Sequence, residues 1–129
     1  MDNGKIKILI AEDEESLREM LALVLQDEGY QTNEAEDGLQ AWDLLNKNHY
    51  DLLVTDLFMP KMNGFDLIIK CHEHFSKTKT ILLSGGGKEI EAEHGCRNIK
   101  YLDQETEVDI YLKKPCSLNE FLSTIEKIL

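Results

Sequence analysis

Short apolar runs that alternate with segments of helical periodicity are the feature that most limits the fold of this 129-residue chain. Such alternation predicts repeated βα units, in which a parallel sheet is covered by helices on both faces. The predicted strands are Lys5–Ala11, Tyr30–Ala35, Tyr50–Thr55, Thr80–Leu83 and Val108–Leu112. The second of these is the most polar, so we expect it to lie near an edge of the sheet. The sequence therefore predicts a doubly wound, five-stranded parallel sheet.

Five helices are expected between and after these strands. The first begins at Ser16 and ends at Gly29, and the second covers Leu39–Asn48. The third follows Gly64, a residue typical of a turn. A last helix is capped by Ser117, because apolar residues recur after it at helical spacing. These apolar residues are Leu118, Phe121, Leu122, Ile125 and Ile128.

The segment from Gly85 to Glu107 is the least regular part of the chain. Three consecutive glycines are followed by a charged run, and only Asn98–Glu105 has a plausible helical pattern, with Ile99 and Leu102 as its apolar contacts. We therefore expect a displaced, atypical fourth helix. The segment is either a tolerated surface insertion or an element that a partner recognises.

Polar residues stand at the end of four of the apolar runs. They are Glu12-Asp13, Asp56, Ser84 and Lys114-Pro115. Because the carboxyl ends of parallel strands line one crevice, these side chains are expected to converge there. Crowded carboxylates favour a divalent cation, and a hydroxyl and an ammonium group favour the oxygens of a phosphoryl group. The residues thus predict metal-assisted phosphoryl transfer.

The same residues, in this order, resemble the receiver domain of bacterial two-component response regulators, of which chemotaxis regulators are examples. The resemblance includes the stretch Asp56-Leu-Phe-Met59-Pro60-Lys-Met-Asn-Gly64 and extends over essentially the whole chain. It implies a flavodoxin-like fold, a single domain over residues 1–129, and a phosphorylation switch that depends on Mg²⁺. The partners implied are a sensor histidine kinase or a histidine phosphotransfer protein, and a downstream protein that reads the switch.

The resemblance also implies a role for individual residues around the phosphoacceptor. Asp56 matches the carboxylate that takes the phosphoryl group. Asp13 matches a direct Mg²⁺ ligand, Glu12 a ligand that acts more often through water, and the backbone carbonyl of Phe58 a further ligand. Glu12 stands where aspartate is commoner, which lengthens the reach of its carboxylate.

The remaining matches concern the far side of the crevice. Lys114 corresponds to the lysine that pairs with a phosphoryl oxygen, and the family often has a cis peptide before Pro115. Ser84 corresponds to a hydroxyl that moves inward to the phosphoryl group. Tyr111 corresponds to the aromatic side chain that rotates inward as that hydroxyl moves. Cys116 replaces a common phenylalanine but does not touch the phosphoryl chemistry.

Composition excludes several other classes of protein. A net charge of −11, with few and scattered basic residues, argues against binding to nucleic acid. No apolar run approaches the ~20 residues that span a bilayer, and the N-terminus has no signal-peptide pattern. Three widely spaced cysteines suggest reduced thiols. We expect a cytoplasmic protein that contacts neither membrane nor nucleic acid.

Three other functions share part of this pattern. A phosphatase of the haloacid dehalogenase type uses similar groups, but it needs an acid two residues after its nucleophile, where this chain has Phe58. A flavodoxin-like electron carrier needs a phosphate-binding loop where the acidic Glu12 and Asp13 stand. A receiver used only for docking has no need of Asp56, Ser84 and Lys114 together. The chain could also be one part of a longer DNA-binding regulator or hybrid kinase.

Overall fold

The computed structural model describes residues 3–85 and 90–129. Their elements follow in the order η1 (Asn3–Lys5), β1 (Lys7–Ala11), α1 (Glu15–Asp27), β2 (Gln31–Ala35), α2 (Gly38–Lys47), β3 (Leu52–Asp56), α3 (Gly64–His74), β4 (Lys79–Ser84), β5 (Ile90–Glu91), β6 (Asn98–Tyr101), β7 (Gln104–Glu107), β8 (Ile110–Lys113) and α4 (Leu118–Ile128). All five predicted strands are present, with ends that differ by a few residues.

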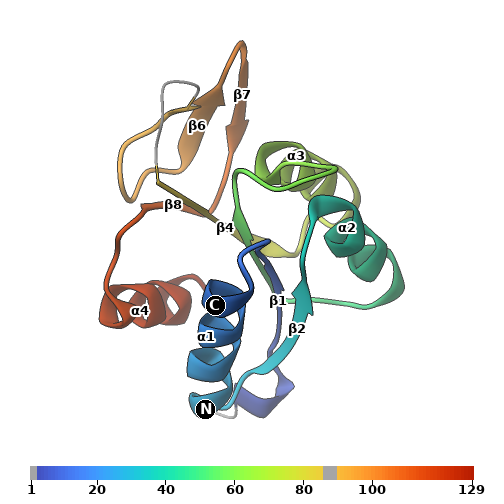
Figure 1. Cartoon of the computed structure of the whole chain (residues 1–129), viewed down its shortest axis with the longest axis vertical. Coiled ribbons are helices and arrows are strands. Elements are labelled where there is room, and N and C mark those ends of the chain that lie inside the picture. The colour runs from blue at the N-terminus through green and yellow to red at the C-terminus, as the bar shows by residue number, and fades with distance from the viewer. Residues whose placement is uncertain (1–2, 86–89) are drawn as a thin grey trace.

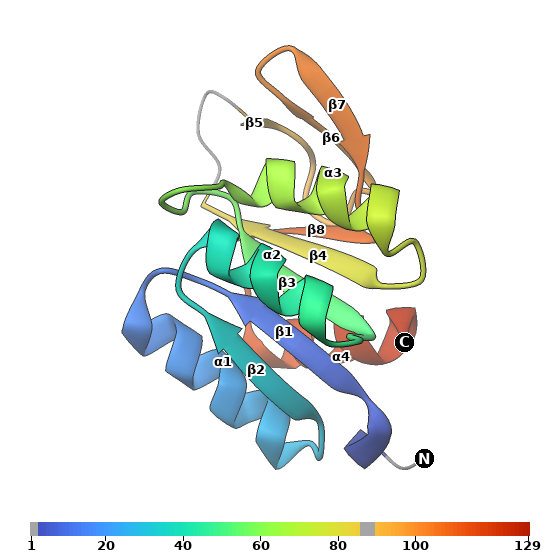
Figure 2. The ribbon, with the colours of Figure 1, turned by 90° about the vertical axis from the view of Figure 1, so that its right-hand side faces the viewer.

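The five strands form one parallel sheet in the order β2-β1-β3-β4-β8 (Figures 1 and 2). Strand β2 lies at one edge, as its polar pattern predicts. Helices α1 and α4 cover one face of the sheet, and α2 and α3 cover the other (Figure 2). The doubly wound, flavodoxin-like architecture expected from the sequence is therefore confirmed.

Apolar residues on both faces of the sheet form the core. Ile8 and Ile10 of β1 pack towards α1 and α4, whereas Leu9 and Ala11 pack towards α2 and α3. The alternation along one strand reflects the period of two in β-structure, and burial on both faces explains why the strand is apolar throughout. The expected cap of the last helix is also present, because the Ser117 hydroxyl accepts a hydrogen bond from the Glu120 amide at 3.0 Å.

The predicted helix at Asn98–Glu105 is wrong. Strands β6 and β7 form an antiparallel hairpin there, and β5 pairs with β6 to complete a second, three-stranded sheet. Among residues 3–85 and 90–129 the structure has four α-helices, so the expectation of five flanking helices is corrected. The reason is packing, because Ile99 and Tyr101 lie on the same face of β6 and join the apolar cluster that lies over α3. The four residues 86–89 of the irregular segment lie outside the described part.

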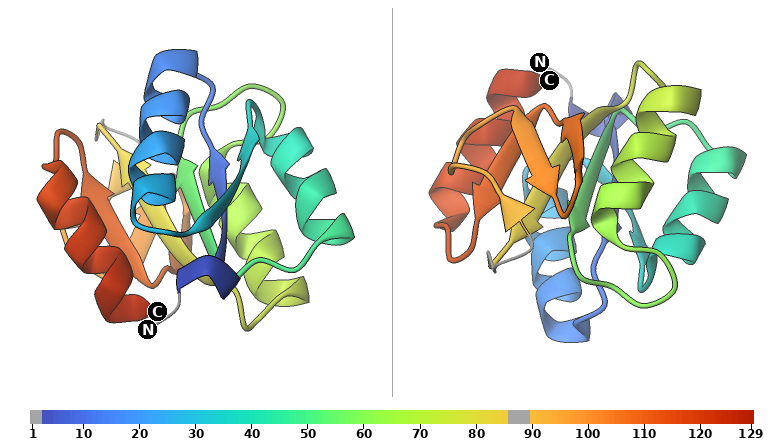
Figure 3. Two further views of the ribbon diagram at one scale, coloured as in Figure 1. Left: turned by 90° about the horizontal axis from the view of Figure 1, so that it is seen from below. Right: turned by 90° about the horizontal axis from the view of Figure 1, so that it is seen from above.

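The three-stranded sheet stands beyond the edge strand β8 and beside α3 (Figure 3). The chain just before β6 also protects β8. The amide of Gly95 donates to the carbonyl of Tyr111 at 2.7 Å, and the amide of Tyr111 donates to the carbonyl of Cys96 at 2.9 Å. The amide of Lys113 donates to Nδ1 of His94 at 3.0 Å. The edge of the main sheet is thus covered by residues 94–96, just before the segment that was expected to be a helix.

Two further sequence expectations concern small features. The Lys114–Pro115 peptide is cis, as the resemblance implied. The three cysteines are free thiols, and burial raises the pKa of Cys71 to about 12. Within the described residues, no helix is both long enough and apolar enough to cross a bilayer.

Candidate functional site

Three carboxylates meet at the carboxyl ends of β1 and β3, as the strand order predicts. Oxygen atoms of Glu12, Asp13 and Asp56 lie within 4.8 Å of one another. Glu12 is 2 % exposed, Asp56 is partly buried and Asp13 is open to solvent. Oxygen ligands at this density, with one side open to water, are what Mg²⁺ requires, so the residues present fit that ion.

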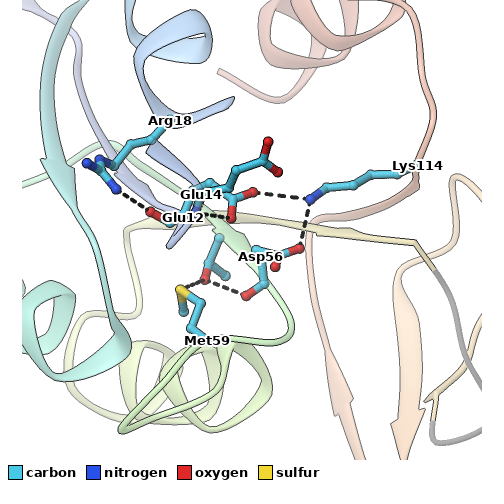
Figure 4. A network of polar contacts seen from close by, with 7 residues as sticks. Glu12, Glu14, Arg18, Asp56, Met59 and Lys114 are labelled. Carbon is cyan, nitrogen blue, oxygen red and sulfur yellow. Dashed lines mark hydrogen bonds and ion pairs between the residues drawn. The ribbon is translucent and has the colours of Figure 1, made fainter. Parts of the chain in front are cut away.

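Lys114 bridges two of these carboxylates and offsets their mutual repulsion (Figure 4). Its Nζ lies 3.0 Å from Oδ1 of Asp56 and 3.1 Å from Oε1 of Glu12. The lysine follows β8, and its own amide donates to the carbonyl of Ser84 at 2.7 Å. The loop is therefore anchored to β4, and the ammonium group reaches across the crevice to β3 and β1.

Burial and mutual repulsion dominate the electrostatics of the site. Burial raises the pKa of Glu12, and the charge of Asp56 raises it further. Burial also raises the pKa of Asp56. The charge of Lys114 lowers this pKa, but its effect is smaller than that of burial. Burial alone would lower the pKa of Lys114, but the charges of Asp56 and Glu12 reverse this and raise it. The cluster carries more negative charge than the lysine neutralises, which favours a cation.

Glu12 is held by three contacts that the sequence did not reveal. Its Oε2 accepts a hydrogen bond from the amide of Glu14 at 3.2 Å, while Lys114 occupies Oε1. The Arg18 guanidinium donates to the backbone carbonyl of Glu12 at 2.9 Å and lies 3.4 Å from a carboxylate oxygen of Glu34. Both side-chain oxygens of Glu12 are thus engaged. Asp13 has no hydrogen bond or ion pair within the described residues.

The loop after Asp56 is fixed by close backbone contacts. A Cβ atom on Gly64 would lie 2.0 Å from the carbonyl oxygen of Asp56, and one on Gly38 would lie 2.0 Å from that of Met62. The Thr55 hydroxyl also donates to the carbonyl of Asp56 at 2.9 Å. Gly64 belongs to the motif quoted above, whereas neither Gly38 nor Thr55 could be recognised without the fold. These contacts determine where the Asp56 carboxylate points.

Ser84 and Tyr111 lie on neighbouring strands and are both about 1 % exposed. Burial raises the pKa of Tyr111, and a hydrogen bond with the Ser84 side chain opposes that increase. The tyrosine is therefore already packed inside the protein in this structure. Phe58, in the loop after β3, has 45 % of its surface exposed, and its ring lies 6.4 Å from that of Tyr101 of β6, measured between centroids.

Comparison with known proteins gives one consistent match. The family model described as the response regulator receiver domain matches residues 8–126. The transcriptional regulatory protein SrrA of Staphylococcus aureus is 31% identical over 123 residues, which are 95% of this chain and 47% of that protein. The chain thus spans about half the length of the curated relatives it matches.

Solved structures with the same fold cover nearly all of the chain. The response regulator TrrA of Thermotoga maritima, in complex with Mg²⁺ and BeF, is 26% identical with a TM-score of 0.78, over 96% of this chain and 99% of that one. The chemotaxis response regulator CheY4 of Vibrio cholerae is 25% identical with a TM-score of 0.76, over 96% and 98% of the two chains.

Proposed function

The chain belongs to the response regulator receiver domain family, and from this premise we propose that residues 1–129 form one receiver domain whose phosphoacceptor is Asp56. The observation that carries the proposal is the convergence of Asp56, Glu12, Asp13 and Lys114 on one point. The domain is not an enzyme in the usual sense, since the group it modifies is its own side chain.

The proposed reaction is a nucleophilic displacement at phosphorus. A carboxylate oxygen of Asp56 attacks the phosphoryl group of a phosphohistidine, the P–N bond breaks, and the imidazole departs with a proton. The product is an acyl phosphate on Asp56. Lys114 is placed to pair with a phosphoryl oxygen, because its Nζ already lies 3.0 Å from Asp56. Hydrolysis by water regenerates the carboxylate.

Asp13, Asp56 and the backbone carbonyl of Phe58 are the proposed Mg²⁺ ligands. Glu12 acts through a water molecule, since Lys114 and the Glu14 amide already occupy its two oxygens. When bound, the cation supplies charge neutralisation between the carboxylates and the incoming phosphoryl group. The residues of the chain then need only orient the nucleophile and the lysine.

Mg²⁺ is expected to bind weakly and to be required for labelling by acetyl phosphate, because Mg²⁺ keeps several waters in such sites. Calorimetric titration should show that Asp13→Asn weakens binding by about tenfold and more than Glu12→Gln does. Asp43→Asn is the matched control, since Asp43 is an exposed residue paired with Lys47 on α2. Equal labelling with and without a chelator would refute the role of the metal.

The proposed switch begins at Ser84. A phosphoryl group on Asp56 offers three acceptor oxygens, and Ser84 can exchange its hydrogen bond with Tyr111 for one with the phosphoryl group. Tyr111 is already buried, so it is the loss of its partner, rather than a movement from solvent, that disturbs β8. Because Tyr111 pairs with Gly95 and Cys96, the disturbance extends to the segment before β6.

Amide exchange should detect this switch. Beryllofluoride with Mg²⁺ is expected to change protection at Ser84, Tyr111 and residues 94–101 more than in α1 and α2, since hydrogen bonds link Ser84 to Tyr111 and Tyr111 to Gly95 and Cys96. The variant Ser84→Ala should bind beryllofluoride and yet show a smaller change at Tyr111. Changes confined to α1 and α2 would show that the switch does not follow this route.

A phosphodonor protein is the proposed upstream partner, either a histidine kinase or a histidine phosphotransfer protein. An apolar hollow of about 260 Å³ between α1 and α4 reaches Lys114 and supports such docking, with Met20 and Leu118 each about two-fifths exposed at its rim. A downstream protein partner and a cytoplasmic location complete the proposal. Direct binding to nucleic acid is not proposed, because the chain carries a net charge of −11.

A further inference from the structure

We propose that the groove between α3 and β7 binds an extended, basic segment of a partner protein, which adds a fourth strand to the β5-β6-β7 sheet. This inference goes beyond the phosphorylation site and does not depend on it. Strand β7 lies at the edge of its sheet, and α3 runs beside it (Figures 2 and 3). A hollow of about 700 Å³ opens between them, with Ile69, Met62 and Gln104 among its lining residues.

The pairing of the hairpin determines which backbone groups of β7 face the groove. Tyr101 and Gln104 close a two-residue turn, so they form a hydrogen-bonded pair. Hydrogen-bonded and non-hydrogen-bonded pairs alternate in an antiparallel ladder, so Glu105 and Glu107 belong to non-hydrogen-bonded pairs. The hydrogen bond from the Val108 amide to the Arg97 carbonyl, at 2.8 Å, agrees with this alternation. The N–H and C=O groups of Glu105 and Glu107 therefore point away from β6.

Backbone N–H and C=O groups that point away from the sheet are the groups to which an added strand forms hydrogen bonds. A partner strand would satisfy them with main-chain hydrogen bonds, while its side chains would alternate between the two faces of the sheet. Tyr101 and Ile99 anchor the hairpin from its inner face, and the Tyr101 ring lies 5.3 Å from that of Phe65 on α3. The edge is thus held in place before any partner arrives, which lowers the entropy cost of binding.

The charges along the groove indicate a basic partner. Four carboxylates border the groove and its continuation along β7, and none has an ion-pair partner within 4.0 Å among residues 3–85 and 90–129. They belong to Asp66, Glu73, Glu105 and Glu107. Basic residues are fewer along the groove itself. Lys79 and Arg97 line only the continuation beside Glu107, where Arg97 lies 4.0 Å from Asp109. The two lysines of the groove are engaged elsewhere. Lys61 lies 3.5 Å from Asp37, and Lys70 lies over the ring of Trp42 at 5.3 Å.

A second copy of this chain fits the edge less well than a basic segment. Glu105 and Glu107 are two residues apart and point to the same face of β7. If two copies paired through β7 with their outer faces on the same side, Glu105 of each would stand opposite Glu107 of the other. Like charges directly opposite each other destabilise a strand pair, whereas lysine or arginine at those positions would stabilise it.

A six-residue peptide of alternating lysine and valine, acetylated and amidated at its ends, provides a direct probe. NMR titration at low salt should show binding, with slower exchange of the Glu105 and Glu107 amides. The same peptide with glutamate in place of lysine, and the lysine–valine peptide N-methylated at every residue, should each bind at least about tenfold more weakly. The N-methylated peptide keeps the charge but cannot donate main-chain hydrogen bonds.

Two variants of the protein separate charge from strand addition. Glu105→Pro removes an outward N–H that β6 does not use, so the hairpin should fold and binding should be lost. Glu105→Gln with Glu107→Gln should weaken binding about fivefold, whereas Glu19→Gln with Glu126→Gln, an equal change of charge on α1 and α4, should not. If Glu105→Pro does not fold, the N-methylated peptide decides the same question.

Three results would overturn the proposal. Equal binding of the N-methylated peptide would mean attraction by charge alone. Equal binding by the Glu105→Gln, Glu107→Gln variant would place the peptide elsewhere on the surface. Concentration-dependent dimers of the wild-type protein, with the Glu105 and Glu107 amides protected, would assign the edge to a second copy of the chain.

Discussion

Replacing Asp56 with asparagine is expected to abolish phosphorylation by acetyl phosphate, with a loss of at least about 10³-fold in rate. The amide is a poor nucleophile towards phosphorus, and among the described residues the other carboxylate paired with Lys114 is that of Glu12. The neighbouring Glu12 is buried, with both oxygens occupied, so it is not available to replace Asp56. Intact-mass measurement after incubation with acetyl phosphate and Mg²⁺ gives the labelled fraction directly.

The control for this variant is Asp43→Asn, which makes the same chemical change on the exposed surface of α2. It should be labelled as fast as the wild type. A thermal melt should show that Asp56→Asn is folded, so that loss of labelling reflects chemistry. Undiminished acid-labile labelling of the folded Asp56→Asn protein would exclude Asp56 as the phosphoacceptor.

Gly64→Ala is expected to destabilise the protein by about 3 kcal/mol and to slow labelling of Asp56 by about 100-fold. The new Cβ atom would lie 2.0 Å from the carbonyl oxygen of Asp56 and 2.9 Å from its carbonyl carbon, so either α3 or the end of β3 must shift. The two Asp56 atoms that the new Cβ would meet belong to the backbone, which cannot move aside as a flexible side chain can. The Gly64 amide also donates a hydrogen bond to the carbonyl of Leu57 at 2.8 Å. Urea unfolding and the rate of labelling measure the two effects.

Gly85→Ala provides the matched control, since no described atom apart from its chain neighbours lies within 4 Å of its added Cβ atom. Its stability should stay within about 0.5 kcal/mol of the wild type. If the two alanine variants unfolded at the same urea concentration, the close approach of Gly64 to Asp56 would not be a constraint on the site.

The position of the site could be predicted from the sequence because of a property of parallel sheets. Residues at the ends of β1, β3 and β4 must meet at one edge, whatever the details of packing. Glu12, Asp56 and Ser84 therefore lie where their place in the chain indicates. The contacts of Arg18 with Glu12 and Glu34 were not predictable, since they depend on the angle at which α1 leaves the sheet.

The helix predicted at Asn98–Glu105 was wrong for a different physical reason. Over so short a segment, helical and strand periods are hard to distinguish, and the pair Ile99 and Leu102 suggested a helix. In the structure Leu102 is 59 % exposed, at a positive φ of 56° in the turn, whereas Tyr101 packs with Ile99 over α3. The alternation of Ile99, Tyr101, Thr106 and Val108 was the sequence pattern that could have indicated a β-hairpin. Contacts with residues distant in sequence decided between the two structures.

The most direct test of the central claim is to locate the phosphoryl group in the wild-type protein. After labelling with acetyl phosphate and Mg²⁺, reduction with borohydride converts an aspartyl phosphate into homoserine, and peptide mapping by mass spectrometry identifies its position. We predict that homoserine appears at position 56 alone, in proportion to the labelled fraction, and not when a chelator is present. Reduction at Asp13 or Glu12, or a stable phosphate on Ser84, would contradict the assignment of Asp56.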